Sequence, residues 1–335
     1  MYPSIELDLT IVERNLLAWQ AFAGLPVRAV VKSNGYNWGA RAMVAALDPV
    51  AAGFCVADAD ELFALRGATK KPVVLLGAVE HSRLNDVLDA GGVPTLDTVA
   101  ELEIVAAWAG ARGRRPLVRV GILPSAGWSG VSIEQLRSLA PALARAPVDV
   151  ELWTHLTDPA GAIEQLEAYR QGVELLEAAD VRLVGGDVAA TAPAAAGHVA
   201  GTHLRVGAGL FGASSGWVPG VTCALRVRAP VVRSQHFAAG TRVGYGDTVL
   251  SAPSSIAVGR CGYADGFPNV AASSPVILSV GMQYVTVPIE AVDVDGTIHL
   301  IDERTDLDAL AAAARRGVHE IVTTLGLASQ RRGEG

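Results

Sequence analysis

Apolar residues follow two different spacings along the chain, and the spacing changes after residue 212. Up to that point, short apolar runs alternate with longer segments in which apolar residues recur every three or four positions. The short runs predict parallel strands covered on both faces, and the longer segments predict helices that pack on them. The predicted strands are 27–32, 53–58, 72–77, 93–97, 116–122, 148–156, 182–189 and 203–212, and the clearest helices are 59–67, 82–90, 132–140 and 162–179.

Eight strand–helix units in about 200 residues match the number at which parallel strands close into a barrel. We therefore predict an α/β fold in which residues 8–215 form a (β/α)8 barrel of the TIM type. An open, doubly wound sheet has the same periodicity and is the alternative that this pattern does not exclude.

The pattern beyond residue 212 favours antiparallel β structure. Small residues at 213–220 form a linker, and the segments after it alternate apolar and polar positions between turns such as Asp295-Gly296. Such alternation is typical of hairpins. We predict a smaller, mostly-β domain at 221–335, with one helix at 307–317 and with residues 1–7 as candidates to join the domain.

Composition narrows the classes of function. Half of the 335 residues are hydrophobic and 18% are charged, so the chain can bury a large core and is not a disordered protein. The formal net charge of −7 argues against a nucleic-acid-binding protein. No apolar stretch is long enough to span a membrane and the first residues do not resemble a signal peptide, so we expect a cytoplasmic protein. Three widely spaced cysteines and the lack of metal-ligand spacing predict neither disulfides nor a metal site.

Lysine is rare in this chain. Only Lys32, Lys70 and Lys71 occur among the 27 basic residues. Lys32 ends the first predicted barrel strand, where side chains point into the mouth of a barrel and a partly desolvated amine is suited to Schiff-base chemistry. An ordinary surface lysine is an equally good interpretation of its position in the pattern. Lys70 and Lys71 precede a strand, at the opposite end of the barrel, and are expected to be solvated.

A glycine-rich segment follows Arg205 in the last predicted barrel strand. Residues 207–212 match G-x-G-x-x-G, but a Pro-containing linker follows and no acidic residue occurs before Asp247. A dinucleotide site needs a helix and a closer acid, so that interpretation fails. We favour a phosphate site made of backbone amides, with tight glycine packing as the alternative. His155, near the end of the sixth predicted strand, is by itself more simply explained as a core histidine.

Several segments together resemble the alanine racemase family. AVVKSNGYNWGA, around Lys32, is similar to the family signature in which the lysine carries pyridoxal 5′-phosphate (PLP). The other similar segments are IELDLTIVERNL, WTHL, HLRVGAGLFG, VGYGDT, GYADGFP and HEIVTTLG. They extend over nearly the whole chain. The family's fold, a PLP-binding barrel followed by a β domain, agrees with the one predicted from the pattern.

The resemblance implies a role for each matching residue. Lys32 would form the Schiff base, and Tyr245 would be a second catalytic base supplied by the partner subunit of a homodimer. The residues implied to contact PLP are Lys32, Tyr36, His155, Arg205, Gly207, Ala208 and His319, the last in place of a phosphate-binding tyrosine. Tyr263 would line the mouth of the site. Because PLP acts as an electron sink, one base on each face of Cα would invert an amino-acid substrate.

The residues that would recognise the substrate depart from the family. Gly121 and Trp128 stand where the resemblance implies a lysine and a carboxylate-binding arginine, and an indole cannot reproduce that paired contact. Asp187-Val188 replaces an Asn–Ser pair. Three hypotheses stay open: a racemase or epimerase whose substrate is not simply alanine, a PLP enzyme of another reaction such as decarboxylation or bond cleavage beside Cα, and a PLP-binding homologue without turnover. Tyr245 favours the first, since a mere binder needs no second base.

Overall fold

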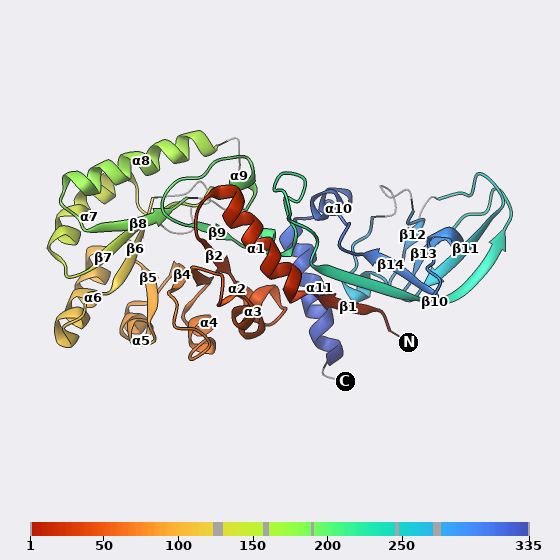
Figure 1. Ribbon diagram of the computed structural model, residues 1–335, viewed down its shortest axis with the longest axis horizontal. Coiled ribbons are helices and arrows are strands. Elements are labelled where there is room, and N and C mark those ends of the chain that lie inside the picture. The colour runs from red at the N-terminus through yellow and green to blue at the C-terminus, as the bar shows by residue number, and fades with distance from the viewer. Residues whose placement is uncertain are drawn as a thin grey trace.

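Eight parallel strands form the first part of the molecule (Figure 1). The computed structural model describes residues 2–122, 130–156, 161–188, 191–244, 248–270 and 276–333. The strands are β2 (Val27–Val30), β3 (Gly53–Val56), β4 (Val73–Ala78), β5 (Gly92–Thr95), β6 (Leu117–Gly121), β7 (Asp149–Trp153), β8 (Leu183–Asp187) and β9 (Leu204–Val206). They follow one another in chain order from β2 to β8, with β9 beside β2, and a bridge from Asp187 to Gly201 brings the two edges together. This order is that of a barrel and not of a doubly wound sheet, so the predicted (β/α)8 architecture is confirmed.

Helices cover the outside of the barrel. They are α1 (Leu9–Ala23), α3 (Ala40–Leu47), α4 (Ala59–Ala64), α5 (Leu84–Asp89), α6 (Val99–Arg112), α7 (Ile133–Arg145), α8 (Ala162–Ala178) and α9 (Thr191–Ala195). Local signals set their ends: the Asp8 carboxylate accepts hydrogen bonds from the first turn of α1, and Gly24 ends that helix at φ +65°. α6 and α7 each begin with a capping box.

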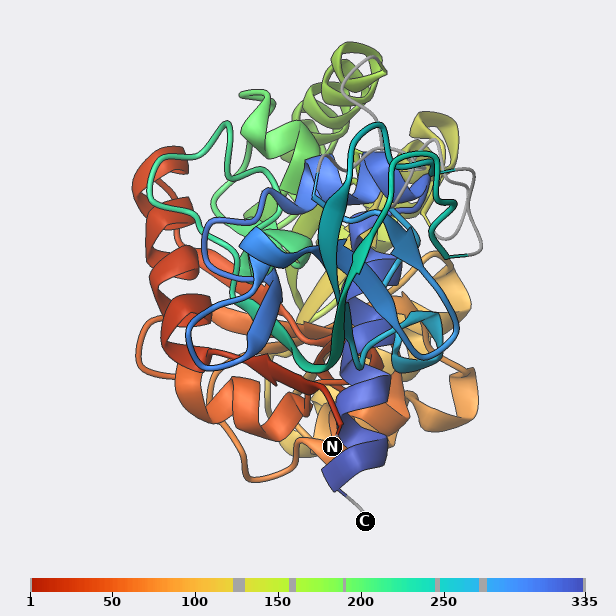
Figure 2. The same cartoon turned by 90° about the vertical axis from the view of Figure 1, so that its right-hand side faces the viewer.

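The second part is an antiparallel sheet that includes the start of the chain (Figure 2). Its strands are β1 (Ser4–Leu7), β10 (Leu225–Phe237), β11 (Ser254–Gly259), β12 (Ser279–Val280), β13 (Val285–Pro288) and β14 (Thr297–Ile301). β1 pairs with β10, so the chain begins in this sheet before it enters the barrel. A smaller, mostly-β second part is therefore confirmed.

Two helices return the end of the chain to the barrel. α10 (Leu307–Ala314) leads into α11 (Val318–Gly333), which lies beside the residues that follow β2. Asn37 Nδ2 and Trp38 Nε1 donate to carbonyl oxygens in α11 at 3.1 and 3.0 Å. The segment that carries His319 is thus held near Lys32. In the described part of the chain, no helix combines the length and the apolar character that crossing a membrane requires.

Candidate functional site

A cavity of about 610 Å³ lies where the barrel strands end and α11 returns. The side chains at the carboxyl ends of barrel strands usually form the active site of such a fold. Seven residues that the sequence predicts to contact a ligand line this one cavity: Lys32, Tyr36, His155, Arg205, Gly207, Ala208 and His319. They come from four separate regions of the chain, and only the tertiary structure brings them together.

Lys32 does not belong to a strand, contrary to the prediction. β2 ends at Val30, and Lys32 opens a short turn, α2 (Lys32–Tyr36), in which Ser33, Asn34 and Tyr36 have φ between 51° and 57°. These left-handed conformations are costly for residues other than glycine and are kept only where neighbours enforce them. Glu61 does so, since its carboxylate accepts a hydrogen bond from the Ser33 N–H at 2.5 Å. The turn directs the half-buried Lys32 into the cavity.

The other two lysines lie outside this cavity. Lys70 is exposed, as predicted. Lys71 is not simply solvated, contrary to the prediction, because its ammonium group donates to the carbonyl oxygens of Asp48 and Ala51. Lys32 is therefore the only lysine available for amine chemistry in the cavity.

The end of β9 forms a cradle suited to an anion. Gly207 and Ala208 lead into a 3-10 turn, η2 (Ala208–Phe211), whose first N–H groups have no carbonyl partner within the turn. A Cβ atom at position 207 would overlap the Tyr36 hydroxyl, so glycine is required for this close approach. Thr191 also lines the cavity, and its hydroxyl accepts from the Gly209 N–H at 3.3 Å. Thr191 was not predicted, although it supplies a hydroxyl three residues after the Val188 that replaces a serine.

Arg205 and His155 both line the cavity, but Arg205 is charged and His155 is neutral near pH 7. Arg205 Nη2 donates to the Thr154 carbonyl at 2.6 Å and Nε donates to Asp187. Burial, together with the charges of Arg205 and Lys32, lowers the pKa of His155 to about 3. His155 is therefore a neutral imidazole near pH 7, which suits contact with an aromatic ring better than contact with an anion.

His319 lies on the α11 side of the cavity. Burial, followed by the charge of Lys32, lowers its pKa. Asp308, also on the rim, accepts a hydrogen bond from the Ser214 N–H at 2.5 Å. Lys32 and Arg205 thus outnumber the one carboxylate among the described lining residues, so the cavity favours an anionic ligand.

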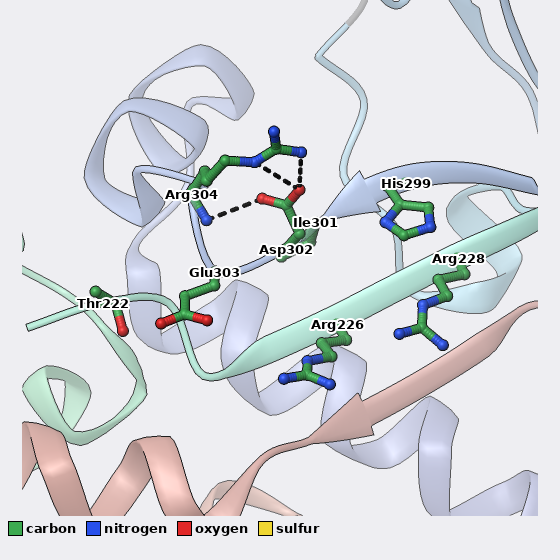
Figure 3. A pocket seen from close by; sticks show the side chains of 8 residues that line it. All are labelled: Thr222, Arg226, Arg228, His299, Ile301, Asp302, Glu303 and Arg304. Atoms are coloured by element: carbon green, nitrogen blue, oxygen red, sulfur yellow. Dashed lines mark hydrogen bonds and ion pairs between the residues drawn. The ribbon is translucent and has the colours of Figure 1, made fainter. Parts of the chain in front are cut away.

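A second cavity, of about 600 Å³, lies between β10 and β14 (Figure 3). Two of its three arginines have acidic partners. Arg304 pairs with Asp302, as Figure 3 shows, and Arg226 pairs with Asp8 at 2.8 Å. No lysine occurs among its described lining residues. Because the second cavity offers no amine among those residues and most of its charged side chains are already paired, the Lys32 cavity is the better candidate for the functional site.

Two family models match the chain in order. Residues 7–215 match the N-terminal domain of alanine racemase, and residues 224–332 match its C-terminal domain. The chain belongs to the alanine racemase family. Relatives agree: the alanine racemase of Xanthomonas campestris is 30% identical over 350 residues, which cover 95% of this chain and 94% of that protein. The alanine racemase of Rhodospirillum rubrum is 29% identical, and the match covers 98% of this chain and 95% of that protein.

Solved alanine racemases share the fold. The enzyme of Streptomyces coelicolor superposes with a TM-score of 0.78 at 20% identity, covering 98% of this chain and 96% of that one. The enzyme of Bartonella henselae, solved with covalently bound pyridoxal phosphate, gives a TM-score of 0.76 at 20% identity and covers 97% of both chains. The family resemblance predicted from the motifs is thereby confirmed. Members of the alanine racemase family are PLP-dependent isomerases.

The Trp153 indole packs against Gly121, the position at which the alanine racemase resemblance implies a lysine. Gly121 ends β6, and a Cβ atom there would lie 3.0 Å from two ring carbons of Trp153 on β7. The guanidinium carbons of Arg119 and Arg205 each lie 5.2 Å from the centre of the Trp153 ring. Trp153 Nε1 is buried and has no hydrogen-bond partner in the described structure. The family lysine is therefore not replaced by another cation at this place.

Three predicted residues are not placed in the cavity. Trp128 and Tyr245 lie outside the described residues. Tyr263 is half-exposed and lines a different groove, with Tyr2 and Leu327, so within one chain it does not reach the Lys32 cavity. Its assignment to the mouth of the site stays a prediction that requires a second subunit. Within the described ranges, no three His, Cys, Asp or Glu residues are grouped to hold a metal ion.

Proposed function

We propose that this member of the alanine racemase family binds PLP through Lys32 and inverts Cα of an amino acid that is not simply alanine. The observation that supports this most is the convergence of the chain's one available amine with an anion cradle, a neutral imidazole and an arginine in one cavity. These are the groups that an aromatic, phosphorylated aldehyde would need. A cavity of about 610 Å³ lies in the range typical of small-molecule sites.

The residues of the cavity fit PLP group by group. The Lys32 amine would hold the aldehyde carbon covalently, and the backbone at Gly207 and Ala208 would donate to the phosphate. The neutral His155 imidazole would lie against the ring, and Arg205 would donate to the ring nitrogen. Tyr36, Thr191 and His319 are positioned to complete the phosphate site.

PLP, when bound, supplies an electron sink that acidifies the Cα–H bond. The chain then has to deliver and remove a proton on each face of Cα. We assign one face to the Lys32 amine and the other to the Tyr245 hydroxyl, contributed by the partner subunit of a homodimer. The walls of the cavity would orient the substrate.

The proposed substrate follows from the absence of the lysine and the arginine that the resemblance implies at positions 121 and 128. A glycine under the Trp153 indole replaces the lysine that the resemblance implies at position 121, and Trp128 replaces the arginine seven residues later. Without that arginine, a free carboxylate loses a paired, oriented contact. We infer a substrate with a larger or more apolar group, or one whose carboxylate is held by other residues.

A second candidate function follows from the same observation. A carboxylate that is weakly held can be lost as carbon dioxide, so decarboxylation or another bond cleavage beside Cα is compatible with this site. A homologue that binds PLP without turnover is the third possibility.

Proton exchange at Cα tests the proposal. The PLP-loaded protein is incubated in D₂O with L- and D-forms of alanine and of larger neutral, acidic and basic amino acids, and the Cα–H signal is followed by NMR. We expect exchange with formation of the opposite enantiomer, faster for another amino acid than for alanine. Release of carbon dioxide without the opposite enantiomer would favour the second candidate. Bound PLP with no reaction of any substrate would contradict a racemase.

His319 is expected to make phosphate binding depend on pH. Its lowered pKa leaves it neutral in the empty site, and an anion would favour the imidazolium form, so binding takes up a proton. Affinity should therefore fall as pH rises, by about three- to tenfold between pH 6 and 8. The measurement is the Kd of pyridoxine 5′-phosphate, which carries an alcohol in place of the aldehyde and so forms no bond to Lys32.

His319→Gln should flatten this dependence, whereas His236→Gln, on an exposed part of β10, should keep it. The phosphate of the ligand also titrates, but it contributes equally to the pH dependence measured with all three proteins. It therefore cancels when their slopes are compared. Equal slopes for the wild type and His319→Gln would contradict the assignment.

A further inference from the structure

Five charged side chains are buried inside the barrel next to the candidate site. Each is at most 3% exposed, and they come from five strands: Arg28 on β2, Arg119 on β6, Glu151 on β7, Asp187 on β8 and Arg205 on β9. Only Arg205 lines the cavity. Burying a charged side chain costs free energy unless the charge is paired. The partners of each side chain therefore indicate its role.

The cluster contains two hydrogen-bonded units, which are linked by an ion pair of 3.4 Å between Arg119 Nε and a Glu151 carboxylate oxygen. Arg28 and Glu151 form a bidentate pair, with both N–O distances at 2.6 Å. Asp187 is shared: one carboxylate oxygen accepts from Arg119 Nη2, and the other accepts from Arg205 Nε. Arg28 also approaches Asp187, at 3.8 Å. Asp187 is thus the only carboxylate of the cluster that contacts the cavity-lining arginine.

Arg205 is held on three sides. Asp187 engages Nε, the Thr154 carbonyl engages Nη2 at 2.6 Å, and the guanidinium carbon lies 5.2 Å from the Trp153 ring centre. Among the described residues, Arg205 Nη1 makes no hydrogen bond or ion pair. This nitrogen is therefore the one left to meet a ligand, and the direction it faces is set by Asp187 and Thr154.

The charge of Arg205 is also partly offset. Burial alone would raise the pKa of Asp187, but Arg119, Arg205 and Arg28 outweigh it and hold the pKa below its usual range. Asp187 is therefore a carboxylate at neutral pH, in direct contact with Arg205. The neutral asparagine that the resemblance implies at this place could accept a hydrogen bond but could not offset charge.

We propose that Asp187 is a positioning residue for the cofactor: it orients Arg205 and reduces the positive field that Arg205 exerts on the ring of bound PLP. This inference rests on the proposed function. A positive charge nearby disfavours the protonated form of a bound group. With Asp187 in place, PLP held by Lys32 keeps its proton to a higher pH than it would beside an uncompensated arginine.

The test is a pH titration of the absorption spectrum of the PLP-loaded protein. In Asp187→Asn the positive field rises, and the midpoint of the spectral change should fall by about one pH unit relative to the wild type. Glu151→Gln is the matched control, because it removes the same charge from the same buried cluster but has no contact with Arg205. Its midpoint should move by much less. Circular dichroism and thermal melting show that each variant is folded.

Arg119→Met provides a second, independent variant. It removes the competing partner of Asp187 and leaves two arginines and two carboxylates in the cluster, so the midpoint should rise. If Asp187→Asn does not fold, the midpoint of Arg119→Met tests the role of Asp187. Unchanged midpoints in the folded variants, with PLP bound through Lys32, would overturn the role of Asp187 and leave the proposed function intact. Wild-type protein without Lys32-dependent absorption would instead overturn the proposed function, and this inference with it.

Discussion

Replacement of Lys32 by alanine should abolish covalent binding of PLP and lower the rate of Cα proton exchange by about 10³-fold or more, the scale on which removal of a covalent or acid–base group acts. The physical reason is that no other amine in the described structure lines the cavity. The measurements are the absorption of bound PLP and its fixation by borohydride, followed by mass spectrometry of the labelled peptide.

Lys70→Ala is the matched control. Lys70 is exposed, lies outside the cavity and should keep both the absorption and the rate of the wild type. Fixation of PLP on Lys70 or Lys71 in the wild type would show that the assignment of Lys32 is wrong, whatever the effect of its removal on activity.

Tyr245→Phe should slow proton exchange for one enantiomer far more than for the other. A base that serves one face of Cα matters only for the proton on that face, and loss of a positioned acid–base group costs about 10²- to 10⁴-fold. Exchange from L- and D-substrates is measured separately in D₂O. The control is Tyr284→Phe. Tyr284 is a half-exposed tyrosine just before β13 that packs on Arg260, and its replacement should leave both rates unchanged. Equal slowing of both enantiomers would contradict a two-base mechanism.

Co-expression of Lys32→Ala with Tyr245→Phe tests whether the tyrosine comes from the partner subunit. In a mixed dimer, one site would then receive both intact residues and the other would receive neither. Random pairing would restore roughly a quarter of the wild-type sites. If Tyr245 acts within its own chain, each site of the mixed dimer keeps one defect and no activity returns.

The barrel was predictable because its strands are buried on both faces and therefore read as apolar runs. The ends of the strands were predicted less well. Residues 148–156 form one apolar run, but β7 ends at Trp153, and His155 and Leu156 beyond it line the cavity. Apolar content does not distinguish a residue that pairs with a neighbouring strand from one that faces a ligand.

The conformation of the lysine turn was beyond prediction. Ser33, Asn34 and Tyr36 adopt positive φ although none is a glycine, and the carboxylate that stabilises this turn, Glu61, lies 28 positions away. The intrinsic backbone preferences of these residues disfavour such a turn. Contacts with α4 and α11, which are distant in sequence, stabilise it. The same limit applies to Thr191, whose role depends on its proximity to Gly209.

The sequence by itself determined the family, the barrel and seven of the residues that line the candidate site, because these depend on motifs and on periodicity along single stretches of chain. The tertiary structure alone decided which charges meet. Arg119, Asp187 and Arg205 lie on three different strands, and their contact depends on the register between those strands and on the alternation that turns all three side chains inward. Neither is encoded in any single segment, so the partner that orients Arg205 became visible only in the folded barrel.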